Sequence, residues 1–211
     1  MNALSLHAAR SLVLALFVGI AATAVHAIEE PAFEVERRLA DDIEIRRYAP
    51  YVVAEVTVPG PAEEAGNRAF PILAGYIFGK NKGERRLEMT APVTQAAEPV
   101  KLPMTAPVTQ APAAGGYVVQ FVLPRAVTLD AAPQPLDDRV KLRQVPATRV
   151  AAIRFSGFWS DANYAEHLTR LQGALKTAGQ AWTGEPVLSR YNPPITPWFL
   201  RRNEIWLALP D

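Results

Sequence analysis

The chain has 211 residues, enough for one domain with a sizeable core, and it balances 22 Lys and Arg against 21 Asp and Glu. This balance, without any basic block, argues against nucleic acid as a partner. There is no cysteine, which excludes thiolate nucleophiles, Fe–S clusters and cysteine-based zinc sites. Of the three histidines only His167 lies beyond the first 27 residues, so the sequence predicts no multi-histidine metal centre.

The first 27 residues have the pattern of a secretory signal peptide. Arg10 is their only full charge, an uncharged apolar run covers residues 11–22, and the small residues Val25 and Ala27 precede the expected cleavage site. The apolar run is shorter than the roughly 20 residues of a membrane-spanning helix, and an uncleaved N-terminal anchor is the alternative interpretation. We therefore expect a mature domain of residues 28–211, periplasmic or secreted, with no stable membrane insertion after cleavage.

Alternating apolar and polar residues predict two strands within residues 33–58, with a turn at residues 49–50. The sequence Pro-Gly-Pro at residues 59–61 ends the second of these strands. The next segment predicts a helix over residues 62–78 that ends at Gly79.

The heptapeptide MTAPVTQ occurs twice, at residues 89–95 and again at 104–110. Each copy places Met, Ala and Val on one face of a strand and the threonines on the other. The proline in each copy suits an edge position or a bulge. The repeat is interpreted either as two neighbouring structural strands or as the wall of a binding cavity.

The rest of the chain alternates between strand and helix patterns. Ser160 and Asp161 are good N-cap residues, and apolar residues follow them at helical spacing, which predicts a second helix over residues 160–178. Strands are predicted on both sides of it, at residues 117–124, 140–145, 148–157, 186–191 and 203–209.

The two halves of the chain resemble each other. The segment VVAEVTVPG before the first helix parallels VAAIRFSGF before the second, with Gly60 and Gly157 at the two strand-to-helix corners. The sequence therefore predicts an α+β fold of two pseudo-repeated halves with one helix packed on the sheet in each. The sheet is expected to be strongly curved or to form a distorted antiparallel β-barrel.

The first predicted helix is apolar on two sides. At about 100° per residue, one face is expected to pack on the sheet, and it consists of Ala65, Ala69, Ile72, Leu73 and Tyr76. The nearly opposite face is also apolar and carries Phe70, Ala74 and Ile77, with Asn67 beside them. Such a helix is either fully buried beneath a segment such as the proline-rich residues 191–199, or it lines a ligand cleft together with that segment.

Five segments resemble the SOUL haem-binding family, and the match extends over roughly residues 33–209. These segments are IEIRRYAPYVVAEV, AFPILAGYIFGKN, MTAPVTQ, VKLRQVPATRVAAIRFSGF and YNPPITPWFLRRNEIW. MTAPV together with RRNEIW is the specific part, and the doubled MTAPVTQ resembles the bacterial, exported branch. The resemblance implies a distorted β-barrel of two similar halves and non-catalytic tetrapyrrole binding.

The resemblance also implies that haem lies between the first helix and the late loop before RRNE. Phe70, Ala74 and Ile77 of the helix would face the porphyrin, and residues 191–199 would close over it. Within that loop, the implied contact residues are Tyr191, Pro194, Trp198 and Phe199.

Two positions depart from the family pattern. Some members have a histidine proposed as the iron ligand where this chain has Arg47. Others use an arginine of the first helix near the propionates, where this chain has Asn67 followed by Arg68. The side chain of Arg68 points about 100° away from that of Asn67, and an asparagine offers no charged fork to a carboxylate. The predicted cofactor is therefore haem without a strong axial ligand.

The remaining candidate residues are interpreted as structural rather than catalytic. His167 lies on the flank of the apolar stripe of the second helix, and Met89 and Met104 fit strand packing better than iron ligation. Ser156, Asp161 and His167 are close in sequence, but no nucleophile elbow surrounds the serine. We expect no enzyme. The alternative to a haem or tetrapyrrole binder is a module that binds another apolar small molecule or a protein partner.

Overall fold

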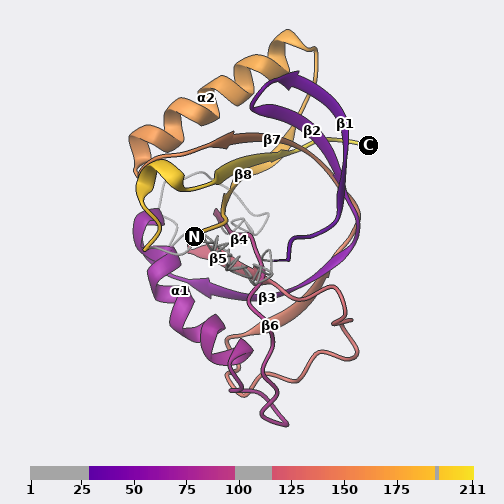
Figure 1. The fold of residues 1–211 in the computed structure, drawn as a ribbon, viewed down its shortest axis with the longest axis vertical. Helices are drawn as coiled ribbons and strands as arrows, with labels where there is room; N and C mark the ends of the chain where they lie inside the picture. Colours follow the sequence, from indigo (N-terminus) through magenta and orange to yellow (C-terminus); the bar gives the residue numbers. More distant parts are fainter. Residues whose placement is uncertain (1–28, 98–115, 193–194) are drawn as a thin grey trace, which may run out of the picture.

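The computed structural model describes residues 29–97, 116–192 and 195–211, which form nine strands and two α-helices (Figure 1). The helices are α1 (Ala62–Ile77) and α2 (Asp161–Thr177), and a short 3-10 helix, η1, covers Trp198–Leu200. The strands are β1 (Phe33–Ala40), β2 (Ile43–Tyr48), β3 (Tyr51–Val58), β4 (Val93–Ala97), β5 (Tyr117–Val122), β6 (Lys141–Val145), β7 (Thr148–Phe155), β8 (Thr183–Arg190) and β9 (Asn203–Ala208).

All nine strands form one antiparallel sheet in the order β1-β2-β7-β9-β8-β4-β5-β3-β6. The sheet curls strongly, as Figure 1 shows, but no described strand connects β1 to β6. The expectation of a closed barrel is therefore wrong, whereas the α+β class is confirmed. The two edge strands read FEVERRLA and KLRQV, and charged side chains of this kind keep a sheet edge in water and oppose further pairing.

Both helices lie on the outer side of the curled sheet (Figure 1). Helix α1 packs on β3 and β5, and α2 packs on β7 and β9. Four of the five residues predicted to face the sheet from α1 are buried in its core, namely Ala65, Ala69, Leu73 and Tyr76, and Ile72 packs beside them. Leu171 and Leu175 anchor α2 in the same way. The helices thus cover separate halves of the sheet, and the joint between β4 and β8 lies between them.

The opposite face of the sheet holds a buried polar network around Glu204 of β9. Glu204 is 0% exposed and accepts hydrogen bonds from Arg46 Nη1 at 2.8 Å, Tyr191 Oη at 2.9 Å, Trp206 Nε1 at 2.8 Å and Arg202 Nη2 at 2.9 Å. Burial alone would raise the pKa of Glu204, but the two arginines outweigh burial and lower it. We call these five residues the Glu204 network, and it accounts for much of the RRNEIW motif.

The predicted elements are found with modest shifts of their ends. Helix α1 covers Ala62–Ile77, one residue shorter than predicted, and α2 begins after Ser160, whose side chain accepts a hydrogen bond from the backbone N–H of Asn163. Residues 33–58 form three strands rather than two, because the chain turns at residues 41–42 between β1 and β2. The two adjacent aspartates at that turn favour a hairpin over a continuous strand.

The first copy of MTAPVTQ is partly a structural strand. Its residues Val93, Thr94 and Gln95 belong to β4, which pairs with both β5 and β8. Thr90, which precedes the strand, is buried and donates a hydrogen bond to the carbonyl oxygen of Val122. The second copy, with Met104, lies outside the described residues, so the pairing of the two copies stays a prediction.

Candidate functional site

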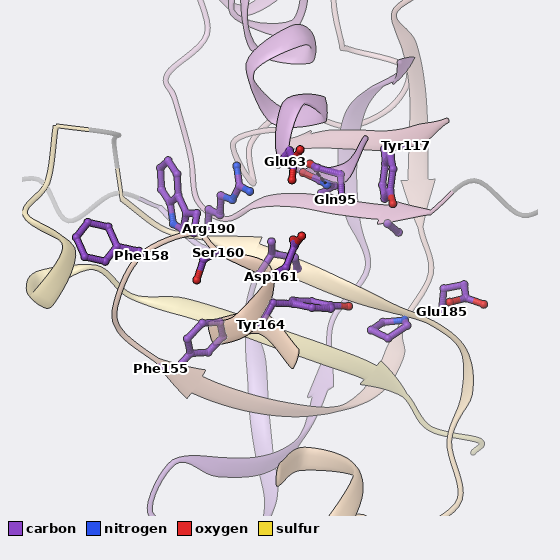
Figure 2. Close-up of a pocket in the computed structure, with 15 residues that line it drawn as sticks. Glu63, Gln95, Tyr117, Phe155, Phe158, Ser160, Asp161, Tyr164, Glu185 and Arg190 are labelled. Atoms are coloured by element: carbon purple, nitrogen blue, oxygen red, sulfur yellow. Dashed lines mark hydrogen bonds between the residues drawn. The ribbon is translucent and has the colours of Figure 1, made fainter. Parts of the chain in front are cut away.

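A pocket of about 230 Å³ lies between the two helices, above the joint of β4 and β8 (Figure 2). In the described chain this joint consists of three residue pairs. We call the cavity the seam pocket. The first turns of both helices and the adjoining strands line it, with side chains of Ala62, Glu63, Gln95, Ala96, Tyr117, Phe155, Phe158, Trp159, Ser160, Asp161, Tyr164, Glu185, Pro186, Leu188 and Arg190.

One end of the seam pocket is built around Arg190, the last residue of β8. Its guanidinium carbon lies 4.5 Å from the centre of the Trp159 ring, a cation–π distance. The Trp159 ring is held in place because its Nε1 donates to Asn203 Oδ1 at 2.8 Å. Gly66 of α1 leaves room for the guanidinium, since a Cβ at this position would lie 2.8 Å from Arg190 Nη1. The cation of the pocket is thus placed by one aromatic ring and one helical glycine.

Two buried polar atoms at this end lack a hydrogen-bond partner among the described residues, Nε of Arg190 and Oε1 of Gln95. Gln95 is 8% exposed, and its Nε2 donates to the carbonyl oxygen of Ala62 at 2.8 Å. Burial, and then the charge of Arg201, lower the pKa of Arg190. No carboxylate in the described part of the chain forms an ion pair with Arg190. Partial burial of this cation costs free energy, because the Trp159 ring replaces only part of the water that the guanidinium has lost.

The rest of the seam pocket is lined by three exposed carboxylates and two tyrosines. Glu63 and Asp161 lie in the first turns of α1 and α2, where negative charge complements the helix dipole. Glu185 and Tyr117 lie at the end opposite Arg190 (Figure 2). The pocket therefore has a polarity, with the arginine at one end and carboxylates in the middle and at the other end.

Exposed aromatic side chains border the arginine end. Phe158 lines the seam pocket and stacks on Trp198 with ring centres 5.1 Å apart, and Trp198 meets Phe199 edge-on at 5.5 Å. The exposed fractions are 59% for Phe158, 47% for Trp198 and 58% for Phe199. We call these three residues the aromatic rim. An exposed apolar surface beside a pocket is typical of ligand-binding and protein-binding sites.

Comparison with known proteins identifies the family. The model of the family described as "SOUL heme-binding protein" matches residues 28–208. The chain belongs to this family. Among curated relatives, heme-binding protein 1 of Bos taurus is 29% identical over 158 residues, which cover 75% of this chain and 77% of the relative. Heme-binding protein 2 of Homo sapiens is 28% identical over 189 residues, which cover 87% of each chain.

Solved structures share the fold of this SOUL family member at low identity. The C-terminal domain of EcmrR superimposes with a TM-score of 0.55 and 12% identity, over 80% of this chain and 97% of that one. A hydrolase from Listeria innocua gives a TM-score of 0.55 and 16% identity, over 80% and 92% of the two chains. At such identities the likeness shows the fold alone.

The three α1 residues implied by the family resemblance lie in different environments. Phe70 is 42% exposed, with its ring centre 5.7 Å from that of Phe121, whereas Ala74 is 7% exposed. Gly66, Phe70 and Ala74 are spaced four residues apart, so they share one side of the helix, the side that Gly66 turns to Arg190. Ile77 is 1% exposed and belongs to the core beneath α1. The burial of Ile77 agrees with the first interpretation of this helical face, in which the protein itself covers it.

The polar positions implied by the family resemblance lie away from the seam pocket. Asn67 is exposed, and Arg68 is bound to Glu64 and, at 3.1 Å, to the carbonyl oxygen of Pro59. Neither residue lines the pocket. Arg47 pairs with a glutamate of β1 at 2.7 Å. The arginine that the pocket presents is thus Arg190.

The residues expected from the late loop are divided between the two faces of the sheet. Trp198 and Phe199 belong to the aromatic rim. Tyr191 is 7% exposed and donates to Glu204 within the buried network on the opposite face, so its side chain supports the fold. Pro194 lies outside the described residues.

The 15 residues that line the seam pocket include no histidine or methionine. His167 stacks on Phe155 at 4.2 Å, and its Nδ1 lies 2.7 Å from the carbonyl oxygen of Asn163. Met89 is 38% exposed in the segment before β4. Within residues 29–97, 116–192 and 195–211, no group of three or more His, Asp or Glu is arranged to hold a metal ion. Over the same ranges, no helix is both long and apolar enough to cross a membrane.

Sequence reasoning missed Arg190, Trp159 and Gln95. A signal for Arg190 was available in the alternation of β8, because Leu188 and Arg190 point to the same face and the first of them is apolar. A charged residue on the apolar face of a strand indicates a special environment. Arg190 was nevertheless not considered, because the loop segment predicted to contact the ligand began one residue later, at Tyr191. The relation of Gln95 to the pocket depends on long-range pairing of β4 with β8, which no local pattern reveals.

Proposed function

We propose that this protein binds haem or a related tetrapyrrole, without catalysis, at the seam pocket and the aromatic rim. Membership of the SOUL heme-binding family supports the ligand class. The observation that carries the location is an open pocket bordered by three large, half-exposed aromatic side chains. The faces of such rings stack on a flat conjugated macrocycle, and burying them on binding removes apolar surface from water.

Both sides of the proposed site come from the elements that the family resemblance implies. Helix α1 contributes its first turn and the side that carries Gly66, Phe70 and Ala74. The late segment contributes Trp198 and Phe199, and its backbone is fixed to the α2 side because the N–H of Gly157 donates to the carbonyl oxygen of Trp198 at 3.0 Å. A porphyrin between them would contact both halves of the sheet.

The residues present fit the ring of a tetrapyrrole better than they fit its iron. The pocket volume of about 230 Å³ is below the roughly 300–1,000 Å³ of pockets that enclose small ligands, so a porphyrin would insert one edge and leave the rest of the ring on the aromatic rim. Histidine and methionine, common ligands of haem iron, are absent from the described lining residues, which offer only Tyr117 and Tyr164 as residues of a ligating type. We therefore expect metal-free protoporphyrin IX to bind about as tightly as haemin.

The proposal is tested by titrating the purified protein with haemin and with protoporphyrin IX, following the Soret band and the quenching of tryptophan fluorescence. We expect saturation at one porphyrin per chain. Phe158→Asp places a charge where the seam pocket meets the aromatic rim and should weaken binding about tenfold or more, since carboxylate desolvation replaces apolar burial. The matched control is Leu136→Asp, at a residue that is 61% exposed in the loop between β5 and β6. Equal affinities for the two variants would refute the location.

A second candidate function is a module for another apolar small molecule or for a protein partner. The small volume of the seam pocket fits a compact compound, and the exposed aromatic rim fits a protein contact. A folded protein that shows only weak, non-saturating spectral change with either porphyrin would favour this function over the first.

We further propose that the chain is exported to the periplasm or the exterior, with residues 1–27 as a cleaved signal peptide and residues 28–211 as the mature domain. The basic residue, the short apolar run and the small residues before position 28 support this. Expression in a bacterial host followed by N-terminal sequencing should give a protein that starts at Ile28. Recovery of the uncleaved chain in the membrane fraction would instead indicate an anchor.

Two related halves are also part of the proposal. The strand order divides at the joint into β1-β2-β7-β9-β8 and β4-β5-β3-β6, and in each half a strand leads through a helix into two further strands. Without the edge strand β1, each half has four strands. Gly60 and Gly157 have positive φ angles of +106° and +116° at the two strand-to-helix corners. The seam pocket would then lie on the pseudo-twofold axis that relates the halves.

A further inference from the structure

Arg190 is an unusual arginine for this fold, because it is half-buried and has no counter-ion among the described residues. Its Nε is buried and unbonded, and its guanidinium has no hydrogen bond or ion pair within the described residues. Arg46, which is buried, is matched by two carboxylates, Glu44 and Glu204, both at 2.8 Å. Among the described residues, the half-buried Arg190 has the face of Trp159 and no carboxylate.

A second buried polar group without a partner lies at the same end of the seam pocket. Gln95 is more than nine-tenths buried, and its Oε1 has no partner among the described residues. Both Gln95 Oε1 and Arg190 Nη1 lie around the missing Cβ of Gly66, at 3.8 Å and 2.8 Å from where that atom would be. Buried polar atoms in native structures are normally bonded, so unbonded donors and acceptors gathered in a pocket indicate a ligand or water that completes them.

From this arrangement we infer that Arg190 binds a carboxylate of the ligand, so that the seam pocket selects ring compounds that carry an acidic side chain. A guanidinium offers parallel N–H donors that fit the two oxygens of a carboxylate. The inference rests on the proposed tetrapyrrole site and refines it, because the acidic side chain of a porphyrin would enter the pocket while its ring stays on the aromatic rim.

The polarity of the seam pocket also sets the orientation of the ligand. Glu63, Asp161 and Glu185 line the middle and the far end, where they repel a second carboxylate. Phe158 lies beside Arg190 at the near end, as Figure 2 shows, and continues into the aromatic rim. A carboxylate should therefore enter from the rim side and stop at Arg190, without passing deeper into the pocket.

The inference is tested with protoporphyrin IX, which carries two carboxylates, and with its dimethyl ester, which carries none. We expect the unmodified protein to bind the free acid more tightly than the ester. Arg190→Gln should weaken binding of the free acid about 10- to 100-fold, the value of a hydrogen bond to a charged group, and leave the ester unchanged. Arg190→Lys keeps the charge and should reduce the affinity for the free acid less than Arg190→Gln does. The matched control is Arg68→Gln, which removes an arginine that is already paired with Glu64.

The outcomes separate this inference from the proposed function. Equal binding of acid and ester, unaffected by Arg190→Gln in a protein that keeps its unfolding temperature, would overturn the inference and leave tetrapyrrole binding intact. A selective loss in Arg68→Gln would also overturn it, because the carboxylate would then be held by α1. If neither porphyrin binds, the proposed function fails, and 2-naphthoate against methyl 2-naphthoate becomes the probe. If the unmodified protein binds 2-naphthoate but not its methyl ester, and Arg190→Gln binds neither, the carboxylate site is supported. If the unmodified protein binds neither compound, the carboxylate site is refuted.

Discussion

The Glu204 network offers a direct measure of what a buried ion pair between Arg46 of β2 and Glu204 of β9 contributes to the stability of the sheet. Glu204→Gln keeps the shape of the side chain but removes its charge, and it turns an amide N–H towards donors from Arg46, Arg202 and Trp206. Removing one member of a buried ion pair costs about 3–5 kcal/mol, because the remaining charge stays buried and unpaired. Since Glu44 still binds Arg46 at 2.8 Å, we expect the lower end, about 3 kcal/mol.

The loss is measured by urea unfolding and by the unfolding temperature, which should fall by about 6–12 °C for a domain of this size. The matched control is Glu36→Gln. Glu36 also accepts from two arginines, Arg47 at 2.7 Å and Arg149 at 2.6 Å, but its side chain is 26% exposed. Exposed pairs of this kind contribute about 1 kcal/mol or less. The two variants therefore differ chiefly in burial.

The pH dependence gives an independent check of the same charge. The pKa of Glu204 in the folded protein lies below its ordinary value of 4.5, so its stabilisation is fully present above that pH and is lost as the pH falls through the folded-state pKa. The difference in unfolding free energy between the unmodified protein and Glu204→Gln should be constant near neutral pH and shrink in acid. A loss no larger than that of Glu36→Gln, or a difference that grows in acid, would refute the reasoning.

Three further predictions concern single positions of the two helices and their corners. Gly66→Ala should raise the free energy of unfolding by up to about 1 kcal/mol, because alanine has the higher helix propensity. The same substitution should weaken porphyrin binding, because the new Cβ would lie 2.8 Å from Arg190 Nη1. An unchanged porphyrin affinity would contradict the placement of Arg190. His167→Ala should leave the Soret spectrum of the haemin complex unchanged, and a shifted band would make this histidine an iron ligand. Gly157→Ala should lower the free energy of unfolding by about 1–3 kcal/mol, because φ at this residue is +116°. Thermal unfolding measures the loss, and the control is Gly173→Ala, at a helical glycine with open space around it.

The sequence predicts the local elements well because their signals are local. The period of α1, the N-cap at Ser160 and the alternation in the strands each depend on neighbouring residues. The predicted barrel failed at a long-range step, because the strand order depends on pairing between distant segments, and the charges of β1 and β6 fit two sheet edges that this order alone identifies. The same limit applies to the site. Phe70 was predicted from the helix angle and stays a prediction, whereas the partners of Arg190 depend on which strands and helices come together.

The position of Ile77 shows a second limit. An angular count places Phe70 and Ile77 on the same outer face of α1, but they end in different surroundings, 42% and 1% exposed. The chain after the helix folds back over the last turn, where the backbone N–H of Leu87 donates to the carbonyl oxygen of Ile77 at 2.7 Å. A return of the chain of this kind buries one part of a helical face and leaves another part open, and the periodicity of the helix carries no information about it.

The joint between β4 and β8 has a consequence for how ligand occupancy can be detected. Three residue pairs form it, against six between β3 and β5. A ligand between Gln95 on one strand and Arg190 on the other would bridge the joint, and its binding free energy would add to the cohesion of the two halves. Backbone amides of β4 and β8 should then exchange more slowly with solvent deuterium when ligand is present. Slower amide exchange in these two strands would therefore report that a ligand is bound, even a ligand that has no visible absorption and no metal.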